Sequence, residues 1–331
     1  MRAETKGWLG WAARILVTLV GGGYLASKLN WAEFSQILRG AEPTWILLAV
    51  LTYGGIVIVS IVRWHLLLEV AGAAVGWMRT SQLIFSGLFF NSVLPGMMGG
   101  DVMRAYWAAK DAPQARAAAV VSILLERVLG LTATVLVGAV LIVPRWTELN
   151  DHPVTHAGAS AFLVVSALLT LILILLGHPA SGRWLAGNHI SGWRKAAGEG
   201  AQACHICLTH PVGAGVGLGL SVLSQLLLVC LFYSVSRAVN LQANFWQLAS
   251  VLPMVVMVTV LPITWNGLGL REAAFVTFLG VFRVAPAQSV AISLGGFAVI
   301  LMWNLVGGVV YLMTGVGKRQ NQKSNRRSDP G

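Results

Sequence analysis

Long apolar runs separated by short polar segments dominate the chain. Six of them reach the length of about 18 or more residues that is typical of a bilayer-spanning helix. We place these predicted spans at roughly 8–29, 44–62, 117–143, 156–177, 211–235 and 288–315. The pattern therefore predicts an all-α, polytopic membrane helix bundle, with a first span that is retained rather than cleaved as a signal peptide.

Two further apolar stretches, 81–94 and 246–262, are too short or too interrupted to be simple spans. Each ends in a Leu-Pro pair, with Pro95 and Pro262 as the helix-breaking residues, and each runs into a Gly-rich segment. This pattern is typical of broken or re-entrant helices. We therefore predict two re-entrant helical hairpins in addition to the six spans.

The two interrupted stretches resemble each other. SVLPGMMGGDVMRA (92–105) aligns with TVLPITWNGLGLRE (259–272) at a constant offset of 167 residues. The identical pairs are Val93/Val260, Leu94/Leu261, Pro95/Pro262, Gly100/Gly267 and Arg104/Arg271. Three predicted spans separate the copies, so the second meets the membrane from the opposite side. We predict an inverted repeat, with repeat elements 81–110 and 246–283, as in many transporters.

Composition excludes a soluble protein. Only 11% of the residues are charged, against about 25% in soluble proteins, and the mean hydropathy is +0.73. The net charge of +11 comes mostly from residues between and after the apolar runs. Such charges mark cytoplasmic loops and meet anionic headgroups, so we predict no nucleic-acid partner.

The charges also predict a topology. A cytoplasmic N-terminus places Arg63, Arg79 and Arg116 inside and leaves 30–43 and 144–155 as outside loops. Six crossings return the C-terminus to the cytoplasm. We predict one transmembrane domain over 1–317 and a basic disordered cytoplasmic tail over 318–331, in a multi-pass protein of the cytoplasmic (inner) membrane.

A few charges fall inside apolar sequence. Glu126 and Arg127 lie roughly 14 Å into a predicted span, where an unpaired charge costs at least about 2.5–3.5 kcal/mol. Both are therefore expected to face the protein interior and to be paired. The predicted partners are Asp101 or Glu272 for Arg127, and Arg104 or Arg271 for Glu126. A polar cavity for a headgroup and a purely structural ion-pair network both fit this pattern.

A broken helix also exposes backbone N–H groups at a helix N-terminus, and these attract anions such as phosphate. Gly99 and Gly100 precede one predicted helix start, and Gly267 and Gly269 precede the other. Arg104 and Arg271 follow within a turn, so guanidinium and N–H groups together would hold a phosphate. The alternative is that each kink only lets a short hairpin pack while the arginine snorkels to the interface.

Other polar residues indicate structural roles. Asn91 and Asn266 flank the two kinks and are predicted to cap freed backbone, with a headgroup hydroxyl as the alternative ligand. Gln225 and Asn304 are predicted to form interhelical hydrogen bonds. The C-x-x-C at 204–207 has no second cysteine pair, so we predict neither a metal nor a cofactor.

Three blocks together resemble the lysylphosphatidylglycerol synthase transmembrane-region family, also called flippase-like domain proteins. They are FNSVLPGMMGGDVMRAY (90–106), LLERVLGL (124–131) and LPITWNGLGLREAAF (261–275). The resemblance implies a membrane bundle that moves lipid headgroups. Because the sequence ends at Gly331 after the basic tail, we expect no aminoacyl-transfer domain. The resemblance implies site residues at Asn91, Pro95, Gly99, Gly100, Asp101, Arg104, Glu126, Arg127, Gly267, Gly269, Arg271 and Glu272.

The function expected from these observations is translocation of a phosphate-containing lipid headgroup. The expected partner is a membrane phospholipid or a polyprenyl-phosphate-linked lipid. One alternative is a membrane-embedded transferase for polyprenyl-phosphate-linked glycans, with Asp101, Glu126 or Glu272 as general base. Another is an accessory protein of a separate lipid-modifying or glycan-synthesis enzyme. No soluble catalytic motif supports an enzyme.

Overall fold

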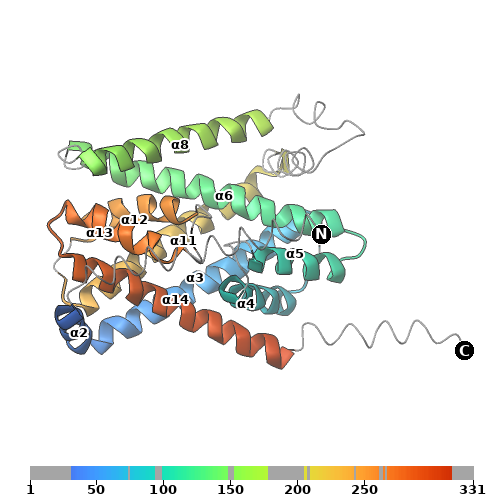
Figure 1. Cartoon of the computed structure of the whole chain (residues 1–331). Helices are drawn as coiled ribbons and strands as arrows, with labels where there is room; N and C mark the ends of the chain where they lie inside the picture. The colour runs from blue at the N-terminus through green and yellow to red at the C-terminus, as the bar shows by residue number, and fades with distance from the viewer. Residues whose placement is uncertain are drawn as a thin grey trace, which may run out of the picture.

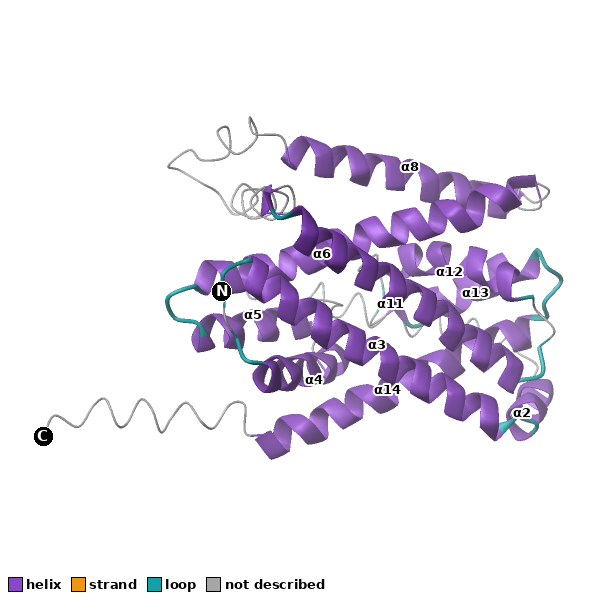
Figure 2. Cartoon of the chain, turned by 180° about the vertical axis from the view of Figure 1, so that it is seen from behind, coloured by secondary structure: helices purple, strands orange, loops and turns teal. Residues whose placement is uncertain are grey.

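The computed structural model describes residues 31–73, 75–93, 99–147, 153–177, 205–206, 209–241, 244–260, 264 and 267–314. Throughout these segments the regular secondary structure is helical, as Figure 2 shows, and no strand occurs in them. The prediction of an all-α fold is confirmed.

Five of the described helices are long and apolar enough to cross a bilayer. At 1.5 Å per residue each exceeds the ~30 Å of a hydrocarbon core. Their bounds are α3 Pro43–Val70, α6 Arg116–Ile142, α8 Pro153–Gly177, α11 Pro211–Ala238 and α14 Pro286–Thr314. These confirm five of the predicted spans, and the sixth, 8–29, lies outside the described residues. A short 3-10 turn, η1 Val143–Arg145, follows α6.

The connection predicted at residues 30–43 is largely helical. It contains the helix α2 Trp31–Arg39, which packs against α14. Apolar residues in this segment are too few for a span but are enough for a short helix lying at the end of the bundle.

The two interrupted stretches form pairs of short helices. The first pair is α4 Trp77–Val93 and α5 Gly99–Asp111, and the second is α12 Phe245–Val260 and α13 Leu270–Gly280. Within each pair the two helices pack against each other. The connecting residues that include Pro95 and Pro262 lie outside the described part of the chain. Broken helices at both predicted positions are confirmed.

The repeat extends well beyond the two hairpins. The first residues of α3, α4, α5 and α6 precede those of α11, α12, α13 and α14 by 168, 168, 171 and 170 residues. Two units of four helices therefore follow the same order, each with a long helix, a hairpin and a second long helix. The offset of 167 residues found in a 14-residue alignment is thus matched to within four residues by all four helix starts of the unit.

The two units are inverted. The N–H of Glu42, before α3, donates to the carbonyl of Ala238 at the end of α11 (2.9 Å), so the two long helices are antiparallel. Each hairpin therefore lies at the opposite end of the bundle: α4 and α5 at the right of Figure 1, α12 and α13 at the left. Each hairpin also packs against the last long helix of the other unit: α4 contacts α14, and α12 contacts α6.

Glycines let aromatic rings approach the helix axes closely. A Cβ at Gly54 of α3 would lie 2.7 Å from the ring of Trp303, and one at Gly308 of α14 would lie 2.7 Å from the ring of Phe89. Helices in a membrane gain no hydrophobic energy by leaving lipid, so contacts of this kind supply much of their association.

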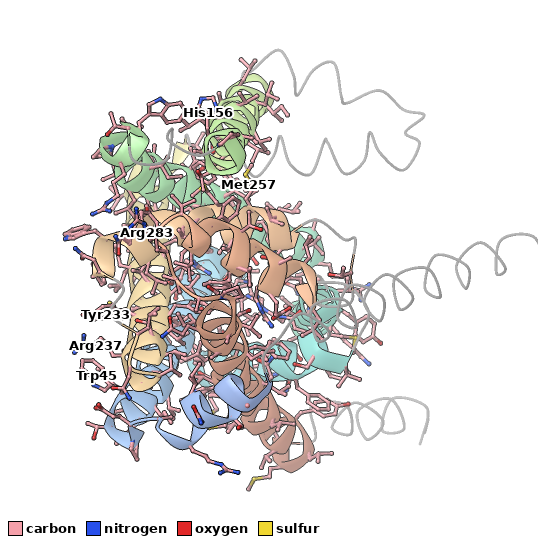
Figure 3. The ribbon with its side chains drawn as sticks, turned by 60° about the vertical axis from the view of Figure 1, so that its left-hand side comes forward. Trp45, His156, Tyr233, Arg237, Met257 and Arg283 are labelled. Carbon is pink, nitrogen blue, oxygen red and sulfur yellow. The ribbon has the colours of Figure 1, made fainter. Side chains whose placement is uncertain are left out.

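Aromatic and basic side chains mark the α12–α13 end. Figure 3 shows Trp45 of α3 beside Tyr233 and Arg237 of α11. The Trp45 and Tyr233 rings meet edge to face at 6.4 Å, and the Arg237 guanidinium lies 5.6 Å from the Trp45 ring centroid. Amphipathic rings and arginine are enriched at the membrane–water interface, so this group indicates the membrane boundary at that end.

The close approach of α4 and α5 gives a test of the hairpin. A Cβ at Gly100 would clash with the carbonyl oxygen of Gly87 and lie 2.6 Å from Asn91 Oδ1. We expect Gly100→Ala to lower the free energy of unfolding by about 1–3 kcal/mol, as overpacking does. The control is Gly130→Ala on α6, where a Cβ meets no atom within 4 Å. Equal unfolding midpoints of the two detergent-solubilised variants would contradict the hairpin packing.

Candidate functional site

A single buried carboxylate joins three helices at the α4–α5 end. Glu126 of α6 accepts a hydrogen bond at Oε1 from Arg63 Nη2 of α3 (2.6 Å) and at Oε2 from Arg104 Nη2 of α5 (2.6 Å). The Glu126 side chain is 9% exposed. Both oxygens of one carboxylate are thus used by two different guanidinium groups, and Arg63 also donates to Ser221 of α11 (3.1 Å).

Asp101 brings a third guanidinium group into the same cluster. Its Oδ1 lies 3.3 Å from Arg104 Nη1, and its Oδ2 accepts from Arg127 Nε (2.7 Å) and Nη2. We call Arg63, Asp101, Arg104, Glu126 and Arg127 the arginine cluster. Its pairs are the first alternatives predicted from the sequence, Arg104 for Glu126 and Asp101 for Arg127, and both are confirmed.

The pairing prediction needs one correction. Arg127 was expected to face the protein interior, but its side chain is 47% exposed, whereas that of Asp101 is 13% exposed. Adjacent residues on a helix point about 100° apart, so burying Glu126 turns Arg127 toward the outside of the bundle. Arg127 is therefore the accessible arginine of the cluster.

Neighbouring residues fix the Arg104 side chain. The guanidinium lies 4.1 Å from the ring centroid of Trp64, and the Trp64 indole N–H donates to Ser122 (3.1 Å). A Cβ at Gly87 would lie 2.6 Å from Arg104 Cδ, so the absence of a side chain on α4 leaves the room that Arg104 occupies. The cation–π contact and the salt bridge together hold one orientation.

The arginine cluster lies away from the middle of the long helices. Arg63 is about 10 Å beyond the middle of α3, taking 1.5 Å per residue, toward the α4–α5 end. Glu126 is displaced from the middle of α6 in the same direction. The cluster therefore belongs to one half of the bundle rather than to its midplane.

Asn91 caps the hairpin from the end of α4. Its Oδ1 accepts a hydrogen bond from the N–H of Gly100 (2.8 Å), and the predicted capping role is confirmed. Gly99 and Gly100 are the first residues of α5 rather than residues preceding it. The N–H group of Gly100, which the sequence suggested as a phosphate ligand, is thus used by a side chain of the protein itself.

At the opposite end, a carboxylate caps the start of the second hairpin helix. Gly267 and Gly269 precede α13 with φ of +74° and +81°, a region that favours glycine. Glu272 reaches back to accept from the N–H of Gly269 at Oε2 (2.6 Å). The N–H group of Gly269 at the start of α13, which the sequence suggested as a phosphate ligand, is therefore also bound by a side chain of the protein.

Arg271 and Glu272 form a pair of their own. Arg271 Nη2 lies 2.7 Å from Glu272 Oε1, and Arg271 Nε donates to Ser293 Oγ of α14 (2.9 Å). Ser293 in turn donates to Glu272 Oε1 (2.9 Å), and the guanidinium lies 4.4 Å from the Phe297 ring centroid. Among the described residues no hydrogen bond or ion pair joins this Arg271–Glu272 pair to the arginine cluster.

Some of the residues named in the sequence analysis lie outside the described structure. Pro95, Pro262 and Asn266 lie outside the described residues, as do both cysteines of the C-x-x-C at 204–207. Within the described segments no group of three or more His, Cys, Asp or Glu residues is arranged to hold a metal ion.

Sequence reasoning missed Arg63. The apolar run predicts a span that ends at residue 62 and places Arg63 in a cytoplasmic loop, but α3 continues to Val70 and Arg63 pairs with Glu126 inside the bundle. The signal that could have found it is the second apolar segment after Arg63, which lets the helix continue by two turns. Ser221 and Ser293 were missed because a serine in an apolar helix carries no distinctive pattern.

Comparison with known proteins agrees with this architecture. The sequence matches the family described as lysylphosphatidylglycerol synthase TM region over residues 11–308. A UPF0104 membrane protein of Methanothermobacter thermautotrophicus is 21% identical over 309 residues, which cover 85% of this chain and 88% of that protein. A UPF0104 membrane protein of Methanocaldococcus jannaschii is 26% identical over 95 residues, 28% of each chain.

The match over most of the chain establishes its class. The protein is an all-α, multi-pass membrane protein, and it belongs to the lysylphosphatidylglycerol synthase TM-region family. The family resemblance expected from the three sequence blocks is confirmed.

The bridging role of Glu126 can be tested by removing only the negative charge of its side chain. Glu126→Gln keeps the shape of the side chain but leaves two buried guanidinium groups without their carboxylate. We expect a loss of about 3–5 kcal/mol in the free energy of unfolding. Arg127→Gln, at an exposed position, is the control, with an expected loss of about 1 kcal/mol or less. Thermal unfolding in detergent measures both, and a Glu126→Gln variant as stable as Arg127→Gln would contradict the bridge.

Proposed function

We propose that the protein translocates a phosphate-containing lipid headgroup across the cytoplasmic membrane. The observation that carries the proposal is the position of Arg104 and Arg271. They are related by the sequence repeat and lie in corresponding hairpins at opposite ends of an inverted bundle. In transporters with inverted repeats, sites built from discontinuous helices are offered to the two sides of the membrane in turn.

The chemistry of both positions suits a phosphate. A guanidinium group presents parallel N–H donors that match phosphate oxygens, and such charge-assisted hydrogen bonds are stronger when water is excluded. Arg104 and Arg271 are 8% and 9% exposed, respectively. Each is already held by a carboxylate, so a lipid phosphate would compete with Glu126 or Glu272 for a guanidinium that is oriented in advance.

The description of the family supports a lipid as the ligand. The family takes its name from a synthase of lysylphosphatidylglycerol, which is itself a phospholipid. We further propose that the α4–α5 end faces the cytoplasm. α14 ends at Thr314 on that side, and the strongly basic residues KRQNQKSNRR follow it in the sequence, as the positive-inside rule requires of a cytoplasmic segment.

The proposal predicts that both arginines are needed. We expect Arg104→Ala and Arg271→Ala each to slow translocation of a fluorescent phospholipid in proteoliposomes by at least about tenfold, through the loss of charge-assisted hydrogen bonds worth about 1.5–3 kcal/mol. Dithionite quenching of the outer leaflet measures the rate. Arg237→Ala, which removes an exposed arginine at the α12–α13 end, is the matched control.

Unchanged translocation in both variants would refute the proposal. Arg104→Lys separates charge from geometry, because lysine keeps the charge but lacks the planar fork, and its rate should fall between those of wild type and Arg104→Ala. In a deletion strain, the proposal predicts a lipid present in the wrong leaflet. Loss of a lipid product instead would point to a transferase.

A further inference from the structure

Within the described residues, the arginine cluster contains one more positive group than negative groups. Three guanidinium groups, those of Arg63, Arg104 and Arg127, share two carboxylates, Asp101 and Glu126. Arg79 and Asp111 (2.6 Å), also at this end, form an ion pair that is complete in itself, and Glu69 has a largely exposed side chain. Among the described residues, the cluster therefore keeps one positive charge in surplus.

The cluster also keeps unused hydrogen-bond donors. The Nε atoms of Arg63 and Arg104 are buried and have no partner within the described structure. A buried donor without a partner is unfavourable, and so is a net charge in a largely buried cluster, more so at membrane depth. One further anion bound beside Arg63 and Arg104 would supply both an acceptor and a counter-charge, and Arg127, which is 47% exposed, is the arginine of the cluster that such an anion can meet first.

The corresponding place at the other end has no such surplus. Arg271 and Glu272 balance each other, and Arg271 Nε already donates to Glu272 and to Ser293. The repeat therefore conserves the position of the arginine but not the charge around it. Asn91, a neutral side chain, caps the first hairpin where the anionic Glu272 caps the second.

We infer that the arginine cluster, and not the Arg271–Glu272 pair, is the loading site, and that it selects a phosphodiester headgroup with a net charge of −1. The inference rests on the proposed function in taking the ligand to be a lipid. A headgroup of charge −1 makes the occupied cluster neutral. A zwitterionic headgroup leaves the surplus positive charge in place, and a dianionic phosphomonoester reverses it.

Equilibrium binding tests the inference without requiring transport. The full-length protein in a non-ionic detergent is titrated with three short-chain lipids: dihexanoyl phosphatidylglycerol (−1), dihexanoyl phosphatidylcholine (zwitterionic) and dihexanoyl phosphatidic acid. We expect phosphatidylglycerol to bind at least about tenfold more tightly than phosphatidylcholine, since only the former leaves no unbalanced charge. Calorimetry gives the three dissociation constants.

Two substitutions change the charge count in opposite directions. Arg127→Gln removes the surplus at a half-exposed position, and the preference for phosphatidylglycerol over phosphatidylcholine should fall to within about twofold. Asp101→Asn raises the surplus by one charge and should shift the preference toward phosphatidic acid. Arg237→Gln, which removes an exposed arginine at the α12–α13 end, is the matched control and should keep the wild-type preference.

The outcomes separate this inference from the proposed function. Equal binding of the two lipids by the wild type, or an undiminished preference in Arg127→Gln, overturns the inference. Selective binding without translocation in proteoliposomes supports the inference and refutes the proposed function. Translocation without selective binding supports the proposed function and refutes the inference. The acyl-free headgroup sn-glycero-3-phosphoglycerol identifies the source: binding as tight as that of the lipid shows that a soluble phosphodiester is recognised, which overturns the lipid part of the inference.

Discussion

The structure depends on the bridge that Glu126 makes between Arg63 and Arg104. These residues come from α3, α5 and α6, and Arg63 extends the connection to α11 through Ser221. A carboxylate and guanidinium groups placed among apolar helices are tolerated only when each contacts an opposite charge, because desolvation of the separate ions costs several kcal/mol. The matching requirement fixes how the re-entrant hairpin sits against three long helices.

The inverted repeat gives the two ends of the bundle the same arrangement of helices, but the charged groups around the arginine differ between the ends. Each end has a hairpin, a capped N-terminus and an arginine held over an aromatic ring, Trp64 at one end and Phe297 at the other. At one end the carboxylate is on a long helix and serves two arginines. At the other end the carboxylate is that of Glu272, which follows Arg271 directly in the chain and pairs with that arginine. The two units share the order of their helices, whereas the charges around each arginine differ.

Much of the fold could be predicted from the sequence because bilayer-spanning helices must be long and apolar, and because proline and glycine interrupt them. Those two constraints located five described spans and both hairpins. The ion pairs of Glu126 and Arg127 could be narrowed to two alternatives each, since charges at membrane depth need partners and few exist. Arg63 was misplaced because a single arginine near the end of an apolar run looks the same whether the helix stops or continues.

The sequence by itself determined the class of protein, the broken helices, the inverted repeat and the short list of charges that matter. It could do so because hydropathy and helix-breaking residues act locally. Only the tertiary structure decided which arginine faces which carboxylate, that the N–H groups of Gly100 and Gly269 are taken by Asn91 and Glu272, and that Arg127 is accessible. These are properties of helices brought together from distant parts of the chain, and no single segment encodes them.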